Sequence, residues 1–447
     1  MIAPVVMLCA VALGVWFLNF LRGRRAAWSV TPAAVMIIGL WVYSVAAAWT
    51  QIFVGGRSST PKIGAAVEAS GVYDVRLLGV AIVILGAGSA VFAYGIDGHW
   101  GGEQRGPESF LLLLFPYVWL IALTFYFGLY FSPTFIVFGA FAVGAWVSPI
   151  RKKDLALVGW LTVILAALAM LTALTDPHET LVARGGGAAD DKALIGTTLL
   201  AGPFGSANTL GLLLALGAPT VLLLRGRWWR FGGLAVVLVA LIWSASRSSL
   251  LALGIAALVI VLCYVGLRYL AALLPIGAAI AIIYVPFAYQ NDWSAFTGRG
   301  LIWRGSIKAW REHPILGDQP NFYQTLYKRT RELGVTAFHG HNVMVTFLVT
   351  GGLITTLMLG ALIAVALYRA VRYACTDPVP LAVLTALLVA GVTELDLDII
   401  SPGNFAFVTW PVLGYLMLTR TSPAREAEHP SHVRSLSNRC VKVVVGI

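Results

Sequence analysis

Two of the seven histidines in the chain lie in one four-residue stretch, His339-Gly340-His341-Asn342. This stretch ends a polar segment and directly precedes an apolar run that begins at Val343. Imidazole gains or loses a proton near neutral pH, so a histidine here is suited to accept a proton from a substrate hydroxyl. The pair could also bind a metal, but no further ligands are evident and no HExxH pattern is present, so we expect none.

Two arginines stand in unusual surroundings. Arg247 lies in the stretch SASRSS, which interrupts a nearly continuous apolar sequence, and Arg299 lies between two glycines. An arginine at membrane depth is costly and usually faces a partner or a cavity. The planar guanidinium can donate two parallel hydrogen bonds to phosphate. Both positions therefore favour an anionic, phosphate-containing ligand, although an arginine that only reaches the membrane interface is the simpler alternative.

Two further polar groups border apolar runs. Asn208, in GPFGSANTLG, can cap the helix that begins there, and the positive end of that helix would favour phosphate. Glu394, Asp396 and Asp398 close a later run. These carboxylates could orient a sugar, balance the arginines or simply lie at the membrane interface.

The elements that position these residues are membrane helices. The chain has 447 residues, of which 59% are hydrophobic and 11% are charged. Runs of about 20 apolar residues, the length that spans a bilayer, recur along it. We therefore predict an all-α, polytopic transmembrane bundle with 12 or 13 spans, near 3–20, 32–54, 77–95, 109–129, 132–149, 155–174, 207–224, 231–246, 248–266, 269–288, 343–366, 379–397 and 403–419.

Basic residues predict the orientation of the bundle. The short loops RGRR (22–25), RKK (151–153), RGRWWR (225–230) and YRAVR (368–372) alternate so that all lie on one side, which the positive-inside rule makes cytoplasmic. The histidines, both arginines and the carboxylates then lie on the outer face. The net charge of +11 fits orientation and lipid contact better than nucleic acid. The four cysteines are far apart in sequence and form no metal or redox motif.

The long outer loop, 289–342, contains a predicted helix over 299–312. Trp303, Ile307 and Trp310 form an apolar stripe along it, and a basic stripe of Arg304, Lys308 and Arg311 runs beside them. This pattern predicts an amphipathic helix on the membrane surface, with tryptophans at headgroup depth. His313-Pro314 ends the helix, because the residue before proline avoids the helical region.

Four segments together resemble the O-antigen ligase and polymerase superfamily of integral membrane glycosyltransferases. They are GPFGSANTLG (202–211), ALIWSASRSSLLAL (240–253), GRGLIWRGSIKAWREHPILG (298–317) and HGHNVMVTFLVTGGLI (339–354). The resemblance covers about residues 200–420. We therefore divide the chain into N-terminal transmembrane helices (1–200), a catalytic transmembrane region (201–420) and a cytoplasmic tail (421–447), which we predict to be disordered.

The resemblance implies a function. A member of this superfamily transfers glycan from a polyprenyl diphosphate carrier to an acceptor hydroxyl at the outer face of the bacterial inner membrane. By that likeness Arg247 and Arg299 would bind the diphosphate, and His341 would be the general base. Asn342, Asn208, Trp303, Gly317 and His339 would have supporting roles. The sequence PILGDQPNF departs from the family by lacking a second glycine after Gly317, which leaves the geometry of that turn open.

The implied reaction is inverting and needs neither metal nor cofactor. Its partners would be a polyprenyl diphosphate-linked glycan, a glycan, lipid or protein acceptor, and the membrane lipids. A polymerase of lipid-linked repeats would need the same base and diphosphate site, so the choice between ligase and polymerase stays open. A transporter or flippase of the same lipid is the main alternative of another class, and a structural membrane protein is a further one. A transporter would need polar residues deep inside several spans.

Overall fold

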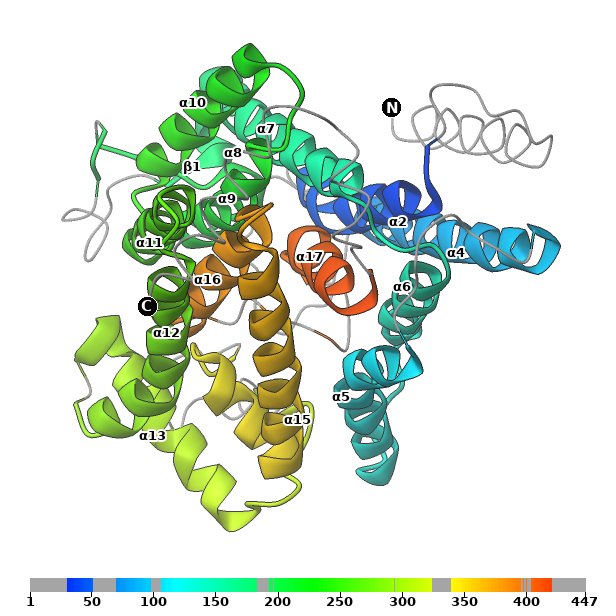
Figure 1. Ribbon diagram of the computed structural model, residues 1–447. Helices are drawn as coiled ribbons and strands as arrows, with labels where there is room; N and C mark the ends of the chain where they lie inside the picture. Colours follow the sequence, from blue (N-terminus) through cyan, green and yellow to red (C-terminus); the bar gives the residue numbers. More distant parts are fainter. Residues whose placement is uncertain are drawn as a thin grey trace, which may run out of the picture.

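The computed structural model describes residues 30–50, 70–97, 106–182, 193–195, 197–292, 294–323, 339–394, 397, 399 and 403–419. These residues form a bundle of helices with one two-residue antiparallel strand pair, in which Leu181 lies opposite Leu200 (Figure 1). In chain order the elements are α2 (Pro32–Trp41), the π-helical turn η1 (Val42–Ala46), α4 (Ser70–Asp97), α5 (Pro107–Tyr126), η2 (Pro133–Phe135), α6 (Ile136–Val147), α7 (Lys152–Thr175), α8 (Pro177–Thr180), β1 (Leu181–Val182), β2 (Leu199–Leu200), η3 (Gly202–Phe204), α9 (Ala207–Val221), α10 (Arg227–Ser244), α11 (Arg247–Tyr264), α12 (Arg268–Tyr289), α13 (Ala295–Glu312), α15 (Val343–Tyr373), α16 (Val379–Gly391) and α17 (Ala406–Leu418).

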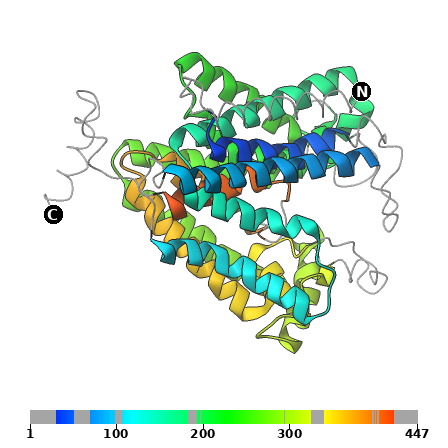
Figure 2. The ribbon, with the colours of Figure 1, turned by 90° about the vertical axis from the view of Figure 1, so that its right-hand side faces the viewer.

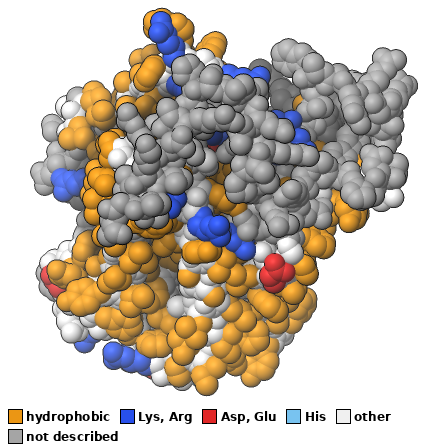
Figure 3. Space-filling view, viewed as in Figure 1, with side chains coloured by type: hydrophobic (Ala, Val, Ile, Leu, Met, Phe, Trp, Pro, Cys, Tyr) orange, Lys and Arg blue, Asp and Glu red, His pale blue; other side chains and the backbone are white. Residues whose placement is uncertain are grey.

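The all-α polytopic fold is confirmed. Within the described ranges, eight helices are long and apolar enough to cross a membrane, and four shorter apolar helices accompany them. Each predicted span from residue 32 onward overlaps one of these twelve helices, whereas the span predicted near 3–20 lies outside the described residues. Hydrophobic side chains cover much of the visible surface (Figure 3), as expected of helices that face lipid.

Two of the short helices, α16 and α17, lie at the centre of the bundle (Figure 1). Every residue of α16 and of α17 is buried, and Figure 1 shows the two helices surrounded by longer ones. A helix of 13 residues is about 20 Å long, less than the roughly 30 Å of the hydrocarbon layer. The span predicted over 379–397 therefore ends early, at Gly391, and Val392–Glu394 form a turn. Polar groups in such a recessed turn need partners from the protein.

Opposite ends of the bundle differ in their chemistry. At one end, Lys152 pairs with Asp377 at 3.0 Å, and Arg369 donates hydrogen bonds to the carbonyls of Leu416 and Met417. The basic segments RKK (151–153), RGRWWR (225–230) and YRAVR (368–372) lie at helix ends on this side, whereas RGRR (22–25) lies outside the described residues. Figure 2 shows long helices running roughly alongside one another. The histidines, Arg247, Arg299 and Glu394 lie at the other ends of their helices. This separation agrees with the predicted alternation, while the identity of each side stays a prediction.

Helix α15 is broken at Gly352, and the turn after α13 fills the break. Gly352 has φ 69° and ψ −168°, which is not helical. Leu353 N–H therefore donates to Pro314 O at 2.9 Å, while Val349 O accepts from Asp318 N–H at 2.8 Å. In an unbroken helix Leu353 would bond Val349 directly. The turn after α13 thus takes the place of hydrogen bonds within α15. This is the geometry of the Gly317 turn, which the sequence left open.

Gly317 is the residue that makes this insertion possible. Its φ is +77°, and a Cβ atom there would lie 2.5 Å from Val349 O and 2.7 Å from Gly352 N. Only glycine fits where two backbones approach so closely in the left-handed region. One glycine at this turn is therefore sufficient.

Helix α13 confirms the predicted outer-loop helix but corrects its environment. Trp303 and Ile307 are 0% and 1% exposed, and they pack with Val345 of α15. The expectation that Trp303 lies at headgroup depth is therefore wrong, because the apolar stripe faces the protein. The basic stripe of Arg304, Lys308 and Arg311, which runs beside the apolar stripe, is exposed.

Candidate functional site

A cavity of about 830 Å³ brings together four residues singled out in the sequence. Asn208 of α9, Arg247 of α11, Arg299 of α13 and His341, just before α15, all line it. The rest of its wall is largely apolar and comes from α11, α12 and α16, including Leu251, Ile255, Leu274, Gly277, Ala278, Ala281 and Val389. The cavity is therefore amphipathic, with cations and an imidazole beside an apolar wall.

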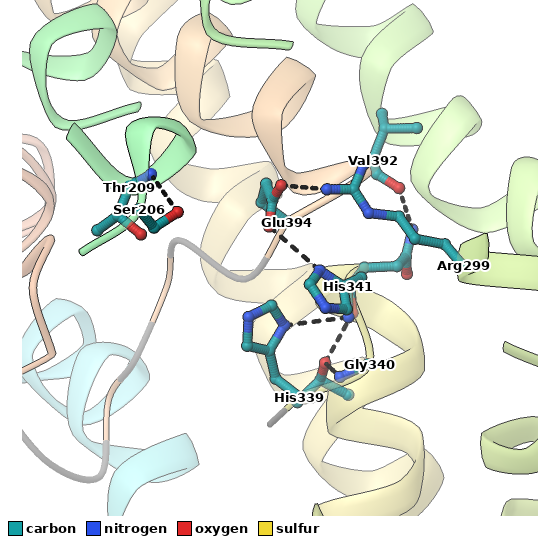
Figure 4. Close-up of polar contacts among 10 residues, drawn as sticks. Ser206, Thr209, Arg299, His339, Gly340, His341, Val392 and Glu394 are labelled. Atoms are coloured by element: carbon teal, nitrogen blue, oxygen red, sulfur yellow. Dashed lines mark hydrogen bonds and ion pairs between the residues drawn. The ribbon is translucent and has the colours of Figure 1, made fainter. Parts of the chain in front are cut away.

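Glu394 joins the arginine to the histidine. One of its carboxylate oxygens forms an ion pair with Arg299, and the other lies 3.3 Å from Nδ1 of His341 (Figure 4). The three side chains are only 16%, 12% and 24% exposed for Arg299, Glu394 and His341. Water therefore screens these contacts little. Of the roles that the sequence allowed for Glu394, this geometry favours charge balance.

The charge of Glu394 fixes the tautomer of His341. Burial alone would raise the pKa of Glu394, but the hydrogen bond from His341 and the positive charge of Arg299 lower it overall. A carboxylate can only accept a hydrogen bond, so Nδ1 of His341 must be the donor. In the neutral imidazole Nε2 then keeps its lone pair. That nitrogen is the one that could accept a proton from a substrate.

His339 supports the same turn. The backbone N–H of His341 donates to Nδ1 of His339 at 3.1 Å, and the two rings lie 4.2 Å apart. Loss of water contact, reinforced by nearby His341, lowers the pKa of His339 to about 3. His339 is therefore neutral, with Nδ1 accepting and Nε2 protonated.

The two histidines and Glu394 are also close enough to be considered as metal ligands. Their ligating atoms lie within 4.8 Å of one another, so the structure supplies the third ligand that the sequence did not reveal. Two observations count against a metal here. First, Nδ1 of His339 accepts a hydrogen bond from the backbone N–H of His341, and its Nε2 carries the proton. Second, Glu394 neutralises the charge of Arg299. This arrangement fits an oriented base better than a metal centre.

Asn342 holds the turn by joining three helices. Its Oδ1 caps α15 by accepting from Val345 N–H at 2.9 Å, and its Nδ2 donates to Ile282 O and Val392 O, both at 3.0 Å. Ile282 O lacks its usual helical donor, because Pro286 has no N–H. Val392 O lies past the end of α16. One side chain thereby satisfies two carbonyls that would otherwise be buried without partners.

Three helix N-termini border the cavity, those of α9, α11 and α15. Each carries roughly half a positive charge from its unpaired N–H groups. The cap of α9 is Ser206, which accepts from Thr209 N–H at 3.4 Å, so the prediction that Asn208 caps this helix is wrong (Figure 4). Asn208 is an exposed side chain in the first turn. These N-termini add to the positive potential of Arg247 and Arg299.

The two glycines around Arg299 have different roles. Gly298, with φ +89°, follows Phe296 and Thr297 in the left-handed region, and all three residues line the cavity. A Cβ atom on Gly298 would have nothing within 4 Å. A Cβ atom on Gly300 would instead lie 1.9 Å from the carbonyl of Asp292. Gly300 therefore permits close packing rather than approach of a ligand.

Two further predicted residues, Trp303 and Gly317, do not line the cavity. Trp303 lies on the face of α13 that packs against α15, and Gly317 lies in the break of α15, so both residues stabilise the fold around the site. Asp396 and Asp398 lie outside the described residues. Sequence reasoning missed Thr393 in the cavity wall and Tyr323 beneath Gly340. Thr393 adjoins Glu394, so its charged neighbour was a usable signal.

Comparison with known proteins finds two similarities. Residues 232–360 match the family model described as O-Antigen ligase. This part of the chain is therefore similar to the O-antigen ligase family. It includes Arg247, Arg299 and His341, whereas Asn208 and Glu394 lie outside the matched range.

A curated relative supports the same superfamily. The Exopolysaccharide production protein ExoQ of Rhizobium meliloti (strain 1021) is 29% identical over 213 residues, which cover 39% of this chain and 47% of the relative. The chain thus aligns with about half the length of that relative.

Proposed function

We propose that the chain is a membrane glycosyltransferase that moves a glycan from a polyprenyl diphosphate carrier to an acceptor hydroxyl. The observation that carries this proposal is the cavity lined by Arg247, Arg299 and His341 beside an apolar wall, with Glu394 paired to His341 behind it. A lipid diphosphate has both an anionic head and an apolar tail. The likeness to the O-antigen ligase family supports the same substrate class.

The proposed reaction is a single displacement. Nε2 of His341 takes the proton of the acceptor hydroxyl as its oxygen bonds to the anomeric carbon. The bond from that carbon to the diphosphate oxygen breaks, and the diphosphate leaves with its polyprenyl carrier. The configuration at the anomeric carbon of the transferred sugar is thereby inverted. Arg247, Arg299 and the helix N-termini stabilise the charge that develops on the leaving group. Glu394 stabilises the imidazolium through Nδ1. No step requires a metal or cofactor.

The acceptor separates a ligase from a polymerase. A ligase transfers the glycan to a different acceptor, and a polymerase transfers it to another lipid-linked repeat. The relative ExoQ is named as an exopolysaccharide production protein, and this favours polymerisation as the second candidate function. We propose the outer face of the bacterial inner membrane as the place of reaction, because the site lies opposite the basic loops.

Release of the carrier tests the proposal. Protein purified in detergent would be incubated with a polyprenyl diphosphate-linked glycan, with and without EDTA, and free polyprenyl diphosphate would be measured. We expect release by the native protein and by His178→Ala, which changes an exposed histidine that does not line the cavity, regardless of EDTA. His341→Ala should lower the rate at least roughly 100-fold. Release that requires a metal, or that survives His341→Ala, would overturn the mechanism, and product mass would separate ligase from polymerase.

A further inference from the structure

The hydroxyl of Tyr323 lies at the centre of a buried hydrogen-bond network. Tyr323 is 4% exposed, and its ring packs with Ile302 and Val349. Its hydroxyl lies 2.9 Å from Oγ of Ser306 on α13 and also bonds Thr346 on α15. Burial raises the pKa of Tyr323 well above its ordinary value, so the group keeps its proton and can donate. This hydroxyl therefore ties the outer loop to α15.

The same network supports the residue between the two histidines. Gly340 N–H donates to Oγ1 of Thr346 at 3.1 Å, and Thr346 donates to the carbonyl of Asn342 at 2.8 Å. A Cβ atom on Gly340 would lie only 2.6 Å from the Tyr323 hydroxyl. Tyr323 and Thr346 thus lie directly against the backbone of Gly340.

The next residue has a conformation that needs such support. His341 has φ +46°, in the left-handed region that side chains other than glycine rarely adopt. A strained conformation persists only where its surroundings hold it. The Glu394 contact holds the ring of His341, whereas the Gly340 contacts hold the backbone that precedes it.

We propose that Tyr323 is a positioning residue that keeps the Gly340–His341 turn in this conformation and so aims His341 into the cavity. It acts through Thr346 and touches no reacting atom. The kinetic part of this inference rests on the proposed glycosyltransferase function. The structural part concerns only the orientation of an imidazole.

The kinetic test uses Tyr323→Phe, which removes only the hydroxyl. We expect kcat to fall roughly tenfold, as a lost buried hydrogen bond near the base would produce, while KM for the lipid-linked glycan changes less than about twofold. Thr346→Val should reproduce this loss, and Thr346→Ser, which keeps the hydroxyl, should restore most of kcat. The matched control is Tyr117→Phe, which removes a buried hydroxyl that donates to Phe135 O at 2.7 Å. Tyr117→Phe should lower the melting temperature at least as much as Tyr323→Phe does, and it should leave kcat unchanged.

A second measurement does not depend on activity. Diethyl pyrocarbonate modifies neutral imidazole, and mass spectrometry can follow its rate at His341. We expect a rate several-fold faster in Tyr323→Phe and unchanged in Tyr117→Phe. Unchanged kcat and unchanged modification in Tyr323→Phe would overturn this inference and leave the proposed function intact. Faster modification in a protein whose native form releases no carrier would support the positioning role and overturn the function.

Discussion

At the residue scale, Glu394 explains how a base and a cation can lie side by side. Arg299 and an imidazolium at His341 would repel each other if no carboxylate lay between them, because both would carry positive charge. The intervening carboxylate neutralises the arginine and orients the imidazole through Nδ1. Arg299 nevertheless still lines the cavity, where a diphosphate could compete for its remaining donors.

Glu394→Gln tests this arrangement through its pH dependence. The folded pKa of Glu394 lies below its ordinary value near 4.5, so the carboxylate stabilises the fold above that pH. This stability should be lost as the pH falls through the folded pKa. Melting temperatures between pH 6 and pH 3 should therefore decline more steeply for the native protein than for Glu394→Gln. Parallel curves would show that Glu394 is not held as a charged partner.

Asn342 permits a second test at this scale. Asn342→Ala removes a helix cap and leaves two buried carbonyls without donors, a loss of roughly 3 kcal/mol in unfolding free energy. Asn404→Ala, at an exposed position, is the control and should change stability little. Thermal unfolding in detergent measures both variants. Equal melting temperatures would contradict the role of Asn342 as a junction.

At the element scale, the break in α15 connects the outer loop to the site. The turn 313–318 takes the place of helical hydrogen bonds around Gly352, so α13 and the two halves of α15 are joined through backbone groups. Backbone bonds of this kind depend little on side-chain identity but strongly on the absence of a Cβ atom. The junction therefore fastens the end of α13, the helix that carries Arg299, to α15.

Gly352→Ala should therefore be far more damaging than another glycine substitution in the same helix. A Cβ atom at Gly352 would lie 2.0 Å from Ile315 O, whereas one at Gly360 has nothing within 4 Å. We expect Gly352→Ala to cost at least about 2 kcal/mol and Gly360→Ala to gain about 0.5 kcal/mol. Melting temperatures of the two variants decide the point. A stable, straight α15 in Gly352→Ala would contradict this account of the junction.

At the scale of the whole molecule, the bundle separates basic loops from the candidate site. Cys375 lies at the end that carries the basic loops, and Lys308 is exposed on α13 at the opposite end. With the other cysteines replaced, a membrane-impermeant maleimide should label Lys308→Cys on intact cells. It should label Cys375 only after the membrane is opened. The reverse result would invert the proposed orientation and place the site in the cytoplasm.

The sequence by itself determined the class of fold, because apolar run length and loop charge depend only on local composition. It also indicated Arg247, Arg299 and His341, since polar residues in apolar surroundings are costly and need a reason to be there. Tertiary structure alone decided that Glu394 lies between Arg299 and His341, positions that are 95 and 53 residues away from it. It also decided that Trp303 faces protein and that Ser206 caps α9. These outcomes depend on which surfaces meet, and a periodic pattern cannot distinguish a stripe that faces lipid from one that faces another helix.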